Sequence, residues 1–187
     1  MLRICHQGAD LVIGHDDLLK YTGRKNIIAA ALSYRVLKWM LPTLSPDRPP
    51  ERRHLLFRLG FAGPGLIDCF EMATRAQSDG RLTVDPDGAP PEAPPAPSGR
   101  FYFEGFYRER GCSAFPLAGF FPPDFVHLVC LYQEGGGTRS EQAAYLAMKE
   151  DVAATILMAA DNDLFSRWVW KRDQHQPDVG ACVPATR

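Results

Sequence analysis

A glycine turn lies between an apolar run and an amphipathic segment, where free backbone amides could hold an anion. Gly63, Pro64 and Gly65 follow the short apolar run 54–61 and precede the segment 66–77. A strand, a tight turn and a helix in this order expose the first amides of the helix at its positive end, which favours a bound carboxylate or phosphate. The turn lacks the spacing of a dinucleotide fingerprint and the lysine of a phosphate loop, so a purely structural turn is the alternative.

Two charged residues on neighbouring predicted helices are the next candidates. Arg35 lies beside Tyr34 on a helix that otherwise looks buried, and a buried guanidinium must be paired or bind an anion. Asp68 lies one turn inside the helix after the glycine turn and could orient a bound amine or water. A structural salt bridge from Arg35 to Glu71 or Asp68 is the alternative. We expect these side chains to line a polar ligand cavity between the Tyr34 helix and the glycine turn.

A histidine beside two carboxylates is a third candidate. His15 precedes Asp16 and Asp17, and an imidazole next to carboxylates can act as a base near neutral pH. Capping of the following helix by the aspartates is the simpler interpretation. Cys69 is a candidate nucleophile, but the sequence has no G-x-S-x-G elbow and no recognisable Cys/His pairing. A buried free cysteine commonly packs as a small hydrophobe, so we expect Cys69 to fill the core.

The cysteines and histidines form no metal motif in the sequence. The five cysteines are an odd number and widely scattered without C-x-x-C, and the five histidines show no H-x-x-x-H or H-x-H pairing. This pattern predicts reduced thiols in a cytoplasm and no metal site, unless distant segments assemble one. The first ten residues lack a charged lead, an apolar block and a cleavage site, which argues against secretion.

Composition argues against nucleic acid and membrane as partners. Lysine and arginine number 21 against 22 acidic residues, a formal charge of -1, so there is no global field for phosphate backbones or anionic lipid. The longest apolar stretch, Ile27–Leu41, is shorter than a bilayer span and is interrupted by Ser33, Arg35 and Lys38. We therefore interpret it as a core helix.

Helical and strand patterns alternate along the chain and must position these residues. Hydrophobic periodicity and turn residues predict helices over 16–21, 25–41, 66–77, 122–133 and from 140 onward, and strands over 54–61, 81–84, 100–110 and 166–171. Pro42 is expected to end the second helix. These elements predict an α+β fold in a single domain, residues 1–172. Its mixed or antiparallel sheet packs against a central buried helix and a long C-terminal helix.

Two segments are expected to lie outside the packed body. Residues 85–99 contain many prolines and almost no large apolar side chain, which is typical of a mobile surface loop. Residues 173–187 are predicted to be a disordered tail.

The order of four motifs resembles the E-type subunit family of formylmethanofuran dehydrogenase. The resemblance spans residues 10–170. In that family a His-Gly-His-x-Cys-Pro-Gly segment precedes a helix with Gly-Tyr-Arg, and a second cysteine stands three residues before an aspartate. The motifs that match here are Ser33-Tyr34-Arg35, Asp68, Asp79-Gly80-Arg81-Leu82 and Asp163-Leu164-Phe165.

The resemblance implies a metabolic setting but no metal. Gly23, Lys25 and Ile27 stand where the family has its two histidines and first cysteine, and Gly65 replaces the second cysteine. Only Tyr34, Arg35 and Asp68 are carried over. The family implies one-carbon metabolism, here tetrahydromethanopterin-linked formaldehyde and formyl chemistry in a methylotroph. The cofactor stays unknown, with a tetrahydromethanopterin or methylofuran-type ligand as the expectation.

The sequence leaves three functional hypotheses open. The first is a cytoplasmic one-carbon protein that binds a small anionic or pterin/furan-like ligand, with His15, Lys25, Tyr34, Arg35, Gly63, Pro64, Gly65 and Asp68 as candidate ligand-binding residues. The second is a non-catalytic interaction or scaffold subunit that docks on an enzyme through a sheet edge or the long C-terminal helix. The third is a metalloenzyme with scattered ligands. A homodimer is compatible with each, and whether the protein is an enzyme stays open.

Overall fold

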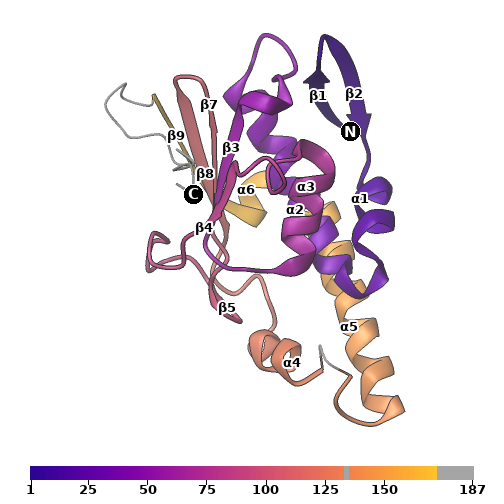
Figure 1. Ribbon diagram of the computed structural model, residues 1–187. Helices are drawn as coiled ribbons and strands as arrows, with labels where there is room; N and C mark the ends of the chain where they lie inside the picture. The colour runs from indigo at the N-terminus through magenta and orange to yellow at the C-terminus, as the bar shows by residue number, and fades with distance from the viewer. Residues whose placement is uncertain (133–134, 172–187) are drawn as a thin grey trace, which may run out of the picture.

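The chain folds around one mixed β-sheet that carries its main helices on one face (Figure 1). A computed structural model describes residues 1–132 and 135–171. The strands, in sheet order, are β4 (Leu82–Val84), β3 (Leu55–Leu59), β7 (Phe103–Tyr107), β8 (Arg110–Pro116) and β9 (Phe165–Lys171). β3 and β4 are parallel, and the other neighbours are antiparallel. The predicted single α+β domain with a mixed sheet drawn from both halves of the chain is confirmed.

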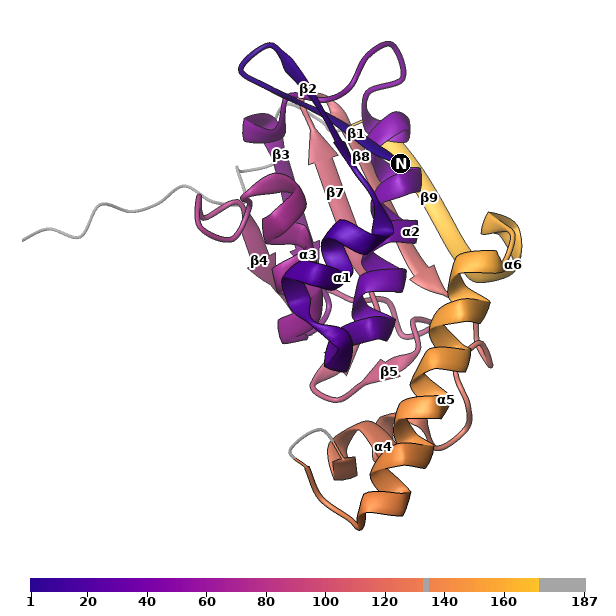
Figure 2. The same ribbon diagram turned by 90° about the vertical axis from the view of Figure 1, so that its right-hand side faces the viewer.

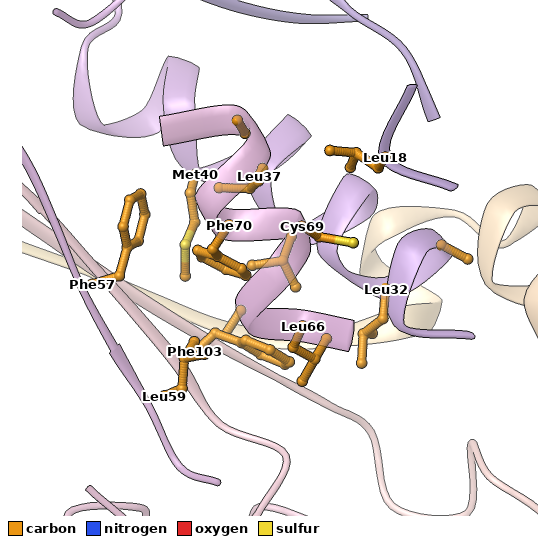
Figure 3. Close-up of a cluster of buried hydrophobic side chains, with 14 of the residues drawn as sticks. Leu18, Leu32, Leu37, Met40, Phe57, Leu59, Leu66, Cys69, Phe70 and Phe103 are labelled. Atoms are coloured by element: carbon orange, nitrogen blue, oxygen red, sulfur yellow. The ribbon is translucent and has the colours of Figure 1, made fainter. Parts of the chain in front are cut away.

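Three helices pack on one another and, through α2 and α3, on the sheet to form the core. They are α1 (His15–Thr22), α2 (Ile27–Leu44, preceded by the short helix η1, Arg24–Asn26) and α3 (Pro64–Thr74). Figure 3 shows Phe70 of α3 between the helices and the sheet, near Phe57 and Phe103. Its ring lies 5.0 Å from that of Phe57 and 6.3 Å from that of Phe103, centroid to centroid. Stacked and edge-to-face aromatic pairs of this kind stabilise a core beyond the area they bury.

Helix α2 is the central buried helix, and it is longer than predicted. It continues through Pro42 to Leu44, because the proline lies in the last turn, where it removes only the amide partner of the Lys38 carbonyl, while Leu41 and Leu44 stay buried. Residues Arg24–Leu44 are long and apolar enough to cross a membrane, so length and composition alone do not distinguish a membrane span from a core helix. In the fold, 61% of the apolar window is buried, as in a core helix.

An N-terminal hairpin that the sequence reasoning missed precedes these helices. β1 (Leu2–His6) and β2 (Ala9–Ile13) pair in antiparallel fashion around Gln7 and Gly8. Both turn residues have positive φ, 54° and 84°, as a tight two-residue hairpin requires. The alternating residues Leu2 and Ile4 are buried and the residues between are exposed or half-buried, a period-two pattern that could have revealed the strand.

The proline-rich segment 85–99 lies mostly on the surface, but two of its alanines, Ala93 and Ala96, are buried. It includes β5 (Pro95–Ala96), which pairs with β6 (Gly99–Arg100). Ala93 is 1% exposed and lies in a small cluster with Tyr102 and Phe115. The small alanine methyls fit against aromatic rings, so few large apolar residues are needed to hold the segment. The predicted tail 173–187 lies outside the described residues.

The chain ends in a long helix that reaches beyond the body. The remaining elements are η2 (Arg52–His54), α4 (Phe125–Tyr132), α5 (Arg139–Met158) and α6 (Asp161–Leu164). The carboxyl half of α5 packs on α2, while its amino half and α4 extend past one end of the sheet (Figure 2). Thr138 and Glu141 form a capping box at the start of α5. The predicted long C-terminal helix is confirmed.

Candidate functional site

Arg35 is fully engaged in holding α5, so its guanidinium is not free to bind a ligand. Nη1 donates to the carbonyl oxygens of Ile156 and Leu157, at 2.6 and 3.0 Å. Nη2 donates to the carbonyl oxygen of Ala159 and to Asp161 Oδ1, both at 2.7 Å. The residue is only 6% exposed. The structural salt bridge considered for Arg35 therefore exists, but its partner is Asp161 and not Glu71 or Asp68.

Asp68 faces another part of the fold. Its Oδ2 accepts a hydrogen bond from Thr22 Oγ1 at 3.1 Å, at the carboxyl end of α1. Asn26 Nδ2 donates to the carbonyl oxygen and to Oγ1 of the same threonine, at 2.9 and 3.0 Å. The network ties the start of α2 to α3. Because Arg35 points to α5 and Asp68 to Thr22, their contacts do not form the shared cavity that the sequence predicted.

The glycine turn is closed by packing. The predicted order of strand, turn and helix is found, but Gly63 caps α3 and the helix begins at Pro64, two residues earlier than predicted. A Cβ atom placed on Gly65 would lie 2.7 Å from Cβ and Cγ of Asn26 and 3.0 Å from Cβ of Ala29. Helices α2 and α3 approach each other here more closely than any larger residue would permit. A cysteine at this position, as in the resembled family, does not fit.

The remaining predicted residues are distributed around α2. Tyr34 Oη accepts a hydrogen bond of 2.9 Å from the amino group of Met1, and its ring meets that of His15 edge to face at 6.0 Å. The His15 imidazole contacts Asp16 through Nδ1 at 3.3 Å. Lys25 is exposed, and its carbonyl oxygen accepts from Lys149 Nζ at 3.0 Å. His15 and Tyr34 are brought together, whereas Lys25 lies at the opposite end of the helix from the pocket described next.

A half-open pocket of about 280 Å³ lies between the carboxyl half of α2, β1 and the loop that follows α2. Its apolar base includes Leu2, Leu37 and Leu41, each no more than 2% exposed. Pro42 leaves the carbonyl of Lys38, on the pocket side of α2, without its helical amide partner. The prolines of the loop complete the wall: Pro42, Pro46, Pro49 and Pro50.

Cations surround this pocket, and sequence reasoning missed them. Arg3, Lys38 and Arg48 line it, with Asp47 the one acidic residue among the lining residues. Arg3 is paired with Asp10 at 2.8 Å, outside the pocket lining, and Lys38 Nζ lies 5.9 Å from the centre of the Tyr34 ring. An apolar base under cationic side chains suits a small flat molecule that carries a negative charge. The proline-rich loop 45–53 with its arginines was the available signal.

Two of the described cysteines, Cys69 and Cys112, are buried thiols with raised pKa values, which argues against a nucleophilic role for either. Cys69 is buried between α2 and α3, and burial raises the pKa of its thiol to about 12. Burial also raises the pKa of Cys112 well above its usual value. The expected core-filling role of Cys69 agrees with this environment. Within residues 1–132 and 135–171, no group of three or more His, Cys, Asp or Glu side chains could hold a metal ion.

These thiols provide a direct test of the core. In a variant with Cys5, Cys130 and Cys182 replaced by serine, we expect no reaction of the folded protein with a thiol reagent at pH 8, because the two remaining thiols are buried and protonated. Two thiols should react after unfolding in guanidinium. Rapid labelling of Cys69 in the folded variant would contradict the packing of α2 on α3, and rapid labelling of Cys112 would contradict the burial of β8.

No family model matches the sequence, and no curated protein is similar to it.

Proposed function

We propose that this chain is a cytoplasmic protein of one-carbon metabolism, similar to the E-type subunit family of formylmethanofuran dehydrogenase, that binds a small anionic ligand of pterin or furan character. The observation that supports an anionic ligand is the pocket beside α2, which is lined by Arg3 of β1, Lys38 of α2 and Arg48 of the following loop. The metabolic setting, tetrahydromethanopterin-linked formyl and formaldehyde chemistry, rests on the motif resemblance alone. The ligand site proposed here replaces the cavity expected between Arg35 and Asp68.

This chain lacks the ligand residues that would hold the metal of the family it resembles. Gly23, Lys25, Ile27 and Gly65 offer no thiolate or imidazole ligands. The contact of Asn26 with Gly65 also fills the space that a side chain at position 65 would need. The proposed function therefore assigns binding to the chain's own cations and apolar surface, and no step to a metal.

Binding would combine two kinds of contact. The base formed by Leu2, Leu37 and Leu41 presents apolar surface to a flat ring system. Lys38 and Arg48, both exposed and without an ion-pair partner among the described residues, can then approach a carboxylate or phosphate at the pocket edge. Hydrogen bonds to charged groups contribute about 1.5–3 kcal/mol each, so the loss of a single cation should weaken ligand binding measurably.

A suitable probe is pterin-6-carboxylate, whose fluorescence reports binding by anisotropy. We expect Lys38→Ala and Arg48→Ala each to weaken binding about tenfold, since each removes one charge-assisted contact. Lys20→Ala, at an exposed lysine on α1, is the matched control and should leave affinity unchanged. Equal affinity of all three variants and the unmodified protein would remove the pocket as the site.

A second candidate function is an interaction subunit that docks through the β9 edge of the sheet. β9 is seven residues long and exposes Trp168 and Val169 at 49% and 55%. The opposite edge, β4, has only three residues. A long apolar edge strand is an available template for strand pairing with another chain. Native mass spectrometry of protein from its own host distinguishes the candidates: a stoichiometric partner enzyme without small ligand favours docking, and a bound small molecule favours the pocket.

A further inference from the structure

Helix α5 has a second face that the fold does not use. Its inner face packs on the body, with four residues that are buried: Tyr145, Val152, Ala153 and Ile156. The outer face is nevertheless rich in small and apolar side chains, because Ala143, Ala147, Ala154 and Met158 are all exposed, the methionine at 80%. A surface helix normally presents charged residues to solvent on the side away from the core. An outer face of this kind is typical of a helix that contacts another helix.

The outer face carries opposite charges at the two ends of one ridge. Arg139, Ala143, Ala147 and Asp151 follow one another at intervals of four residues, so they lie along a single ridge of α5. All four are exposed. No ion pair joins Arg139 or Asp151 to another residue in the described ranges, whereas the nearby Glu150 is paired with Arg24. The ridge is thus basic at its beginning, small in its middle and acidic at its end.

The charges of this ridge are complementary to those of a second copy that lies antiparallel to it. In the commonest class of helix packing, the ridges formed by every fourth residue of two helices run side by side at a crossing angle of about 50°. With two antiparallel copies of α5 in this arrangement, Arg139 of each copy lies beside Asp151 of the other. The alanines between them allow the two axes to approach to about 8 Å.

We propose that this face of α5 is a homodimer interface, with a second copy of the chain packed antiparallel across the ridge from Arg139 to Asp151. Three of the four ridge residues lie in the amino half of α5, which extends past one end of the sheet (Figure 2). Two molecules can therefore meet there through their projecting halves. The symmetric placement of the charges identifies a second copy as the occupant, since an isologous interface requires one surface to match itself.

Sedimentation velocity over a range of protein concentrations tests this interface. The unmodified chain should be a dimer, and Ala147→Glu should make it monomeric, because it introduces two like charges at the centre of the contact. Ala9→Glu, at an exposed alanine of the N-terminal hairpin, is the control and should remain dimeric. All substituted positions are exposed, so folding is expected to persist, and circular dichroism checks it.

Exchanging the charges at positions 139 and 151 distinguishes the proposed antiparallel pairing of α5 from other dimer arrangements. Arg139→Glu or Asp151→Arg alone should weaken dimerisation about tenfold, since each turns two attractive contacts into repulsive ones. The double variant Arg139→Glu/Asp151→Arg should regain the original dissociation constant. A monomeric unmodified protein at every concentration, a dimer that resists Ala147→Glu, or a double variant no tighter than the single ones would each overturn the proposal.

Discussion

Arg35→Ala is expected to lower the free energy of unfolding by about 3 kcal/mol, because it removes one buried and three partly buried charge-assisted hydrogen bonds. The guanidinium supplies four hydrogen bonds to the carboxyl end of α5 and to Asp161, across a contact between segments more than 120 residues apart. The last carbonyls of a helix have no internal partner and carry partial negative charge, so a cation there acts as a cap. Urea unfolding followed by circular dichroism measures the loss.

The matched control for this prediction lies on the same helix pair. Arg24 also joins α5, through an exposed ion pair with Glu150, and its side chain is 72% exposed. Arg24→Ala should cost less than about 1 kcal/mol, as exposed pairs do. Arg35→Lys should recover only part of the loss, because one ammonium cannot reach all of these acceptors. Similar costs for Arg24→Ala and Arg35→Ala would contradict the role assigned to the buried guanidinium.

Gly65→Ala is expected to destabilise the fold by about 2 kcal/mol, within the range found for overpacked cores. The added methyl would lie 2.7 Å from Asn26, inside van der Waals contact, and both residues belong to packed helix ends. The same substitution at a free helical position would usually be stabilising, because glycine weakens helices. The sign of the effect therefore reports the close approach of α2 and α3.

A double-mutant cycle isolates this contact. In an Asn26→Gly background the nearest atoms are removed, so the cost of Gly65→Ala should fall to about half, with Ala29 as the remaining close neighbour. The cost of Asn26→Gly alone combines the lost hydrogen bonds to Thr22 with the added backbone entropy of glycine in the unfolded chain, and the cycle subtracts both. An equal cost of Gly65→Ala in both backgrounds would show that Asn26 is not the residue that limits the space at position 65.

The sequence was sufficient for the class of fold because its main elements have strong local signals. The apolar circumference of α2, the proline and glycine turn before α3, and the alternating aromatic strand β7 each predicted their element. The N-terminal hairpin was missed because Gln7 occupies a positive-φ turn position that usually holds Asn, Asp or Gly, so its turn gives no typical hairpin signal. The packing of residues 85–99 was missed because composition does not show that alanines such as Ala93 can lie under aromatic rings.

The candidate site was harder to predict, because side-chain partners depend on tertiary contacts. The burial of Arg35 was foreseen, but its acceptors are the terminal carbonyls of α5, and no residue pattern near Arg35 indicates that distant helix end. The family motifs directed attention to the amino end of α2, near Gly65. The pocket lies at the carboxyl end of α2. Lys38 and Arg48 line it together with residues of β1, so it depends on a tertiary contact between segments distant in sequence.

Amide NMR spectra of the labelled protein titrated with pterin-6-carboxylate test the proposed binding site most directly. We expect shift changes concentrated at residues 2–3, 37–41 and 45–48, the segments that form the pocket beside β1. Changes centred on residues 22–26 and 63–68, at the junction of α1, α2 and α3, or the absence of any saturable change, would contradict the proposed site.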